Sequence, residues 1–76
     1  MEIKLSIGAI VLRKRIAKKW TQEKLSSKAG INIRFLQKIE AGDRIPSLAT
    51  VFKLAEAFGV EPDELLMPVW KEWIKS

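Results

Sequence analysis

Three glycines divide this chain into short segments, and each follows a stretch whose apolar residues recur at helical spacing. Gly30, Gly42 and Gly59 stand where these stretches stop, and glycine commonly ends a helix because it adopts a positive φ without steric cost. Three residues of the types that favour helix N-termini stand where new helical stretches begin. They are Thr21, Asn32 and Ser47. Short helices are stable only when their apolar faces pack together, so this punctuation predicts a small, compact, all-α domain.

The pattern predicts five helices, at about residues 6–19, 21–29, 33–41, 48–58 and 62–67. The second and third are short and joined by a glycine-containing turn, which is the helix-turn-helix pattern. Pro62 suits the first turn of the fifth helix, and Pro68 is expected to break it. The predicted organisation is therefore a domain over residues 1–67 and an apolar tail over 68–76 with at most one or two further turns. The residues expected to form the apolar faces of the first and fourth helices are Ile7, Ile10, Val11 and Ile16, and Leu48, Val51, Phe52, Leu54, Ala55 and Phe58.

The 76 residues include no cysteine and no histidine, which excludes a disulfide framework and leaves no credible ligand set for zinc. We expect no metal, no cofactor and no enzymatic activity, because the chain offers no nucleophile and base pair. Three carboxylates, Glu61, Asp63 and Glu64, lie at a helix start, where the helix dipole accounts for them. No apolar run is long enough to span a membrane, and Met1–Ile7 does not resemble a secretion signal. We expect a cytoplasmic, nucleoid-associated protein.

The net charge of +5 is distributed unevenly. Residues 1–44 contain 11 Lys and Arg against 4 Asp and Glu, a charge of +7, whereas residues 45–76 contain 3 against 5, a charge of −2. A basic surface favours a polyanionic partner. RNA is disfavoured, because the sequence predicts no sheet that could display stacking aromatics.

The ordered set of motifs resembles the XRE type of helix-turn-helix regulator, the class of phage repressors and Cro. The matching stretches are TQEKL at 21–25, AGIN at 29–32, LQKIEAG at 36–42, IPS at 45–47, LAEAFGV at 54–60 and DELL at 63–66. Each motif alone is common, but their order over residues 7–67 is specific. The resemblance implies a transcriptional regulator that binds double-stranded DNA, and members this short often lack an effector domain.

By this resemblance, residues 33–41 form the recognition helix, which enters the major groove. The matching positions assign base contacts to Ile33, Arg34, Gln37 and Lys38. Arg34 suits guanine, Ile33 a thymine methyl group, and Gln37 adenine or a phosphate. The alternative for the charged members is an ordinary solvated helix face.

The resemblance also implies contacts to the DNA backbone, from Thr21, Gln22, Arg44, Ser47 and Leu48. Helix N-termini present free N–H groups that suit phosphate oxygens. Such contacts fix the register without reading sequence. Thr21 and Ser47 are equally good as plain N-caps, and the two roles are compatible.

Arg15 and Glu40 match positions at which this family commonly has a buried ion pair. Trp20 precedes the second helix at a position that is apolar in the family, which predicts a core residue. Gly8 either permits a close backbone approach or is an ordinary residue near a frayed end. Phe35 replaces a small residue of the family, and either packs against the first helix or adds a stacking surface; packing is favoured.

The tail places Trp70, Trp73 and Ile74 at i, i+3 and i+4, with Val69 adjacent. This apolar cluster either folds back on its own domain or forms a two-fold interface, and the interface is favoured. We expect a homodimer on a palindromic operator, acting as a repressor or controller. The alternative is an antitoxin-like interaction module whose tail neutralises a partner enzyme; a toxin or RNA polymerase would be the protein partner.

Overall fold

The chain folds into five helices without strands over residues 3–75, which are the residues described by this computed structural model, with side chains from residue 7 onward. The helices are α1 (Ile3–Ala17), α2 (Gln22–Ala29), α3 (Ile33–Glu40), α4 (Leu48–Phe58) and α5 (Pro62–Lys75). The predicted all-α, five-helix class is confirmed. Met1, Glu2 and Ser76, which the two predicted segments include, lie outside the described residues.

Capping residues begin α2, α3 and α4, as the sequence predicts. Thr21, Asn32 and Ser47 each accept a hydrogen bond from a backbone N–H of the following turn, at 2.7 to 3.2 Å. Gly30 and Gly59 end α2 and α4 in the left-handed region, at φ +67° and +72°. Side chains and glycines local to each junction therefore set these helix ends.

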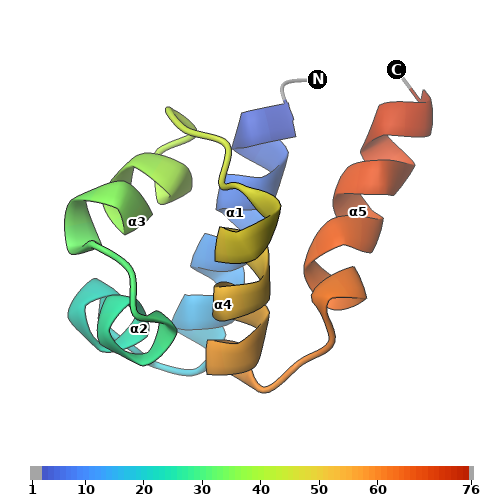
Figure 1. Cartoon of the computed structure of the whole chain (residues 1–76). Coiled ribbons are helices and arrows are strands. Elements are labelled where there is room, and N and C mark those ends of the chain that lie inside the picture. Colours follow the sequence, from blue (N-terminus) through green and yellow to red (C-terminus); the bar gives the residue numbers. More distant parts are fainter. Residues whose placement is uncertain (1–2, 76) are drawn as a thin grey trace.

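Helix α1 packs against α3, α4 and α5, while α2 packs against α3 and α4 (Figure 1). Apolar side chains from all five helices meet between these elements, because each helix has one face to bury. The buried apolar residues are Ile7, Ile10, Val11, Leu25, Ala29, Leu36, Ile39, Val51, Leu54, Ala55, Phe58 and Leu65. Trp20 is half-buried against this core and stacks on Phe58, with ring centroids 5.9 Å apart.

Gly8 is buried where α1 meets the end of α3. A Cβ at this position would overlap the backbone carbonyl oxygen of Ile39. The close-approach alternative is therefore correct, and it explains why glycine stands inside a helix despite its cost of about 1 kcal/mol relative to alanine. The close approach brings α3 directly against α1.

The prediction that Pro68 breaks the fifth helix is wrong, because α5 continues through it to Lys75. Proline inside a helix loses one backbone hydrogen bond and costs about 3 kcal/mol. Apolar packing on both sides offsets that cost: Leu65 is fully buried, and Val69 packs against the core. Full burial of a side chain such as that of Leu65 contributes about 1.5–3 kcal/mol, and the half-buried Val69 adds to it.

Three residues expected on buried faces are exposed instead. Ile16, Leu48 and Phe52 have exposed fractions of 58%, 60% and 48%. Ile16 lies in the last turn of α1, and Leu48 starts α4. Helical spacing alone predicts apolar faces of α1 and α4 that are wider than the buried ones, because no neighbouring helix covers these positions.

No helix within residues 3–75 is both long and apolar enough to cross a membrane.

Candidate nucleic-acid interface

Helix α3 has two faces of opposite character. Leu36 and Ile39 have no exposed surface and hold one face in the core. Arg34, Gln37 and Lys38 are exposed on the other face, and Ile33 beside them is half-buried. Positions 33, 34, 37 and 38 follow the i, i+1, i+4, i+5 pattern of one helix face. The structure thus brings the four predicted base-contacting residues together on one side of a short helix.

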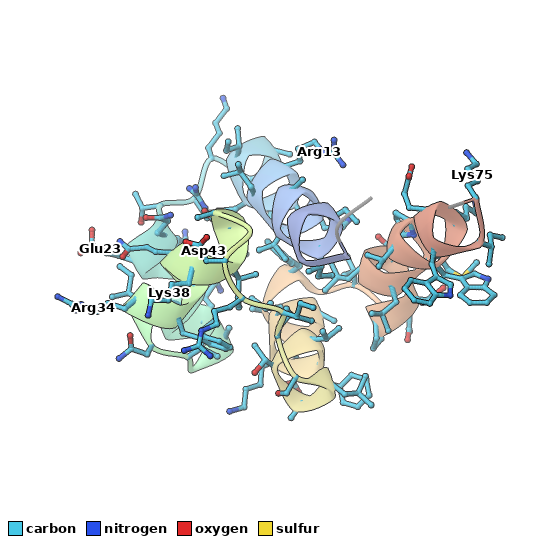
Figure 2. All side chains as sticks on the ribbon, turned by 90° about the horizontal axis from the view of Figure 1, so that it is seen from above. Arg13, Glu23, Arg34, Lys38, Asp43 and Lys75 are labelled. Atoms are coloured by element: carbon cyan, nitrogen blue, oxygen red, sulfur yellow. The ribbon has the colours of Figure 1, made fainter. Side chains whose placement is uncertain are left out.

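This face lies at the periphery of the molecule. Figure 2 shows Arg34 extending into solvent from the side opposite to Lys75 of α5. Arg34, Gln37 and Lys38 line a shallow surface depression together with Ala41 and Asp43. Ala41 and Asp43 are not among the residues predicted for this surface. Asp43 follows α3 in a loop, and no sequence pattern marks its carboxylate as part of this surface.

Arg15 and Glu40 fix the position of α3 relative to α1. Arg15 Nε donates to Glu40 Oε2 at 2.7 Å, and its Nη2 donates to Glu40 Oε1 at 3.0 Å. The exposed fractions of the two side chains are 13% and 4%. The hydrogen bond to Glu40 raises the pKa of Arg15, burial opposes the shift, and the charge of Glu40 adds to it. This bidentate geometry is the strongest form of the interaction.

The same carboxylate binds a residue of α2. Gln22 Nε2 donates to Glu40 Oε1 at 2.9 Å. Gln37 Nε2 in turn donates to Gln22 Oε1 at 3.4 Å. The chain of contacts therefore runs from the buried ion pair through α2 to the exposed face of α3. No sequence pattern links Gln22 with Gln37, because they lie 15 positions apart, in different helices.

The five residues expected to contact phosphates lie before or at helix starts, or in the loop after α3. Thr21 and Ser47 cap α2 and α4, Gln22 and Leu48 are the first residues of those helices, and Arg44 is exposed in the loop between α3 and α4. Only Gln22 is half-buried; the other four are exposed. Two helix N-termini thus accompany α3, one before it and one after it in the chain.

Positive charge gathers next to the start of α2. The ammonium groups of Lys18, Lys24 and Lys28 lie 5.1, 5.4 and 5.2 Å from the ring centroid of Trp20. Cation–π contact holds these lysines near one ring, although their mutual repulsion opposes it. The result is a basic surface adjoining Thr21.

The residues proposed for a subunit interface lie on α5, away from α3. Val69 packs against the core, whereas Trp70, Trp73 and Ile74 have exposed fractions of 52%, 57% and 59%. Leu66, Val69, Trp70 and Trp73 line an apolar depression on this helix. One side of α5 therefore folds back on the domain, as the first alternative for the tail expects, and the other side faces outward; the two-fold interface stays a prediction. Within residues 3–75, no group of three or more His, Cys, Asp or Glu residues could hold a metal ion.

Residues 11–65 of the chain match the model of a helix-turn-helix family. The chain is 34% identical over 68 residues to an HTH-type transcriptional regulator of Sinorhizobium fredii, covering 90% of this chain and 88% of the relative. It is 35% identical over 65 residues to the control protein C.BamHI of Bacillus amyloliquefaciens, covering 84% and 80%.

Solved structures give the same result. The restriction-modification controller protein C.AhdI of Aeromonas hydrophila superposes with a TM-score of 0.79 at 34% identity, covering 82% of this chain and 94% of that one. The controller protein C.Esp1396I has a TM-score of 0.82 at 18% identity, covering 100% and 99%, which shows a shared fold.

Proposed function

The chain belongs to the XRE type of helix-turn-helix transcriptional regulators, and from this membership we propose that it binds a palindromic operator as a homodimer, acting as a repressor or controller. The observation that carries the proposal is the exposed face of α3. Leu36, Ile39 and Glu40 hold this helix in the domain, whereas Arg34, Gln37 and Lys38 are exposed and can contact another molecule.

We propose that this face reads bases in the major groove. Arg34 can donate two hydrogen bonds to O6 and N7 of guanine, a pairing worth about 1–3 kcal/mol of discrimination. Lys38 carries donors only and also suits guanine, while Ile33 offers an apolar surface to a thymine methyl group. These roles agree with the exposure of each side chain.

Phosphate contacts would come from Thr21, Gln22, Arg44, Ser47 and Leu48. The N-termini of α2 and α4 present backbone N–H groups, and Arg44 adds a charge. Their role in the proposal is to fix the orientation of α3 in the groove. The lysines around Trp20 add positive potential next to Thr21.

The homodimer is supported by the outward side of α5. Trp70, Trp73 and Ile74 combine large apolar area with high exposure, and contiguous patches of this kind mark interfaces in soluble proteins. To read two half-sites one helical turn apart, the dimer must hold its two α3 helices about 34–36 Å apart.

Binding-site selection from a random duplex pool tests the DNA-binding proposal. The wild-type protein is expected to enrich an inverted repeat. Arg34→Ala is expected to relax base preference at one position of each half-site, because it removes the bidentate donor. Lys71→Ala on α5 is the matched control and should keep the full preference. Full discrimination by Arg34→Ala would remove Arg34 from the reading face.

Sedimentation with and without the selected duplex tests the assembly. The wild-type protein is expected to sediment as a dimer and Trp70→Glu as a folded monomer, since Trp70 is half exposed and not required by the core. A wild-type protein that stays monomeric on its operator would contradict the dimer. The apolar side of α5 would then favour a different protein partner, as in an antitoxin-like module.

A further inference from the structure

We infer that the buried carboxylate of Glu40 sets the orientation of the Gln37 amide through Gln22, so that Gln37 selects adenine at the base pair it faces. The inference rests on the proposed function, since it requires α3 to lie in the major groove. Gln22 acts as a positioning residue, and adenine is the base that Gln37 contacts. The contacts that carry it run from the core of the domain to the surface of α3.

Glu40 fixes the first amide. Its side chain is 4% exposed, and Arg15 donates to both of its oxygens. An ionised carboxylate accepts hydrogen bonds and donates none. Gln22 must therefore turn its NH2 group toward Glu40, as the 2.9 Å contact from Nε2 to Oε1 shows. The opposite orientation would bring two oxygens together beside a buried charge.

Gln22 then fixes the second amide. With its nitrogen on Glu40, its oxygen Oε1 is the group that faces Gln37, and Gln37 Nε2 donates to it at 3.4 Å. Because an amide is planar, the Gln37 oxygen lies on the branch opposite its nitrogen. Gln37 is exposed and lines the surface depression of α3. It therefore offers one acceptor and one remaining N–H to a base.

Adenine is the base that uses both groups. In the major groove adenine presents a donor at N6 and an acceptor at N7. Guanine presents acceptors at O6 and N7, thymine an acceptor and a methyl group, and cytosine a donor alone. A glutamine free to rotate could exchange its oxygen for its nitrogen and tolerate guanine. A glutamine held by Gln22 meets an acceptor with its own oxygen, so guanine is disfavoured.

The experiment is binding-site selection with the wild type, Gln37→Ala, Gln22→Met and Ser27→Met. Gln37→Ala identifies the base pair that Gln37 reads, as the position whose preference is lost. The wild type is expected to enrich adenine there. Gln22→Met removes the amide but keeps the length of the side chain, and is expected to reduce the preference for adenine over guanine about 3- to 10-fold, the factor equivalent to about one hydrogen bond. Loss of the proposed phosphate contact of Gln22 should weaken all duplexes alike, so the preference at the position read by Arg34 should remain, which loss of folding could not produce.

Ser27→Met is the matched control, because Ser27 is exposed on α2 and the new residue is the same. It should retain the adenine preference. Gln22→Met leaves Arg15 on both oxygens of Glu40, so its melting temperature should stay close to that of the wild type. An adenine preference unaffected by Gln22→Met, or a base other than adenine at the Gln37 position, overturns the inference and leaves the proposed function standing. A wild-type protein that enriches no sequence overturns both.

Discussion

Arg15 joins three parts of the chain through one side chain. It binds Glu40 at the end of α3 through two nitrogens, and its Nη1 donates to the backbone carbonyl of Trp20 at 2.8 Å. Its raised pKa means that it stays charged throughout the ordinary pH range. A raised folded-state pKa stabilises the fold at all pH values below the unfolded pKa, so this contribution is lost only in strong alkali.

Replacing Glu40 by alanine is expected to destabilise the domain strongly. Glu40→Ala leaves the guanidinium of Arg15 buried without its carboxylate partner, which costs about 3–5 kcal/mol when such a pair is broken. That is a large share of the roughly 5–15 kcal/mol that stabilises a typical domain. Urea unfolding followed by circular dichroism measures the change. An unaltered midpoint would show that the pair contributes little to folding.

The pair Lys14–Glu64 provides the control. Its Nζ to Oε2 distance is 3.4 Å, but the two side chains are 30% and 53% exposed. Water screens an exposed pair, which typically contributes about 0–1 kcal/mol. Glu64→Ala should therefore shift the unfolding midpoint much less than Glu40→Ala, although both substitutions remove one carboxylate from one ion pair.

At the scale of helices, the features that could be predicted from sequence are those that depend on neighbouring residues in the chain, such as helix starts. The starts of α2, α3 and α4 depend on the side chains of Thr21, Asn32 and Ser47, and each is visible as a single residue. The course of α5 depends instead on packing with α1 and α4. A proline ends a helix by local rules, and tertiary contacts, among them those of Leu65, Leu66 and Val69, override these rules in α5.

The candidate site likewise has features that local spacing predicts and features that depend on contacts between helices. The exposed face of α3 follows from helical spacing, since burying Leu36 and Ile39 turns Arg34 and Lys38 outward. The contacts from Glu40 to Gln22 and Gln37 join different elements. No spacing rule within one helix could predict them, and the same applies to the close approach of Gly8 to Ile39.

Pro68→Ala tests how α5 is stabilised. Pro68 is exposed within the helix and contributes no N–H to it. Alanine restores the donor and removes the clash of the ring with the preceding turn, so we expect an increase in stability of about 1–3 kcal/mol. Thermal unfolding measures it, with the exposed Lys71→Ala of the same helix as the control. A lower melting temperature for Pro68→Ala would indicate that the proline itself is needed for the packing of α5.

For the whole molecule, the excess of basic residues and the exposed tryptophans of α5 lie in different parts of the chain. The basic residues concentrate in residues 1–44, which carry +7, while residues 45–76 carry −2. In Figure 2 Arg34 and Lys38 lie on the side of α3, and Lys75 lies across the molecule on α5. The side of α3 therefore suits a polyanion, and the exposed tryptophans lie apart from it on α5.

This separation predicts that two substitutions, each replacing one basic residue by glutamine, differ in their effect on DNA affinity. Each phosphate contact releases condensed counterions, so the slope of log K against log salt concentration is about −0.9 per contact. Arg44→Gln, in the loop after α3, is expected to reduce the magnitude of this slope by about 0.9 and to weaken all duplexes alike. Lys75→Gln removes the same charge from the end of α5 and should leave the slope unchanged. Fluorescence anisotropy titrations with the selected duplex over a range of salt concentrations measure both. Equal reductions for the two variants would mean that net charge alone, and not a defined surface around α3, attracts the DNA.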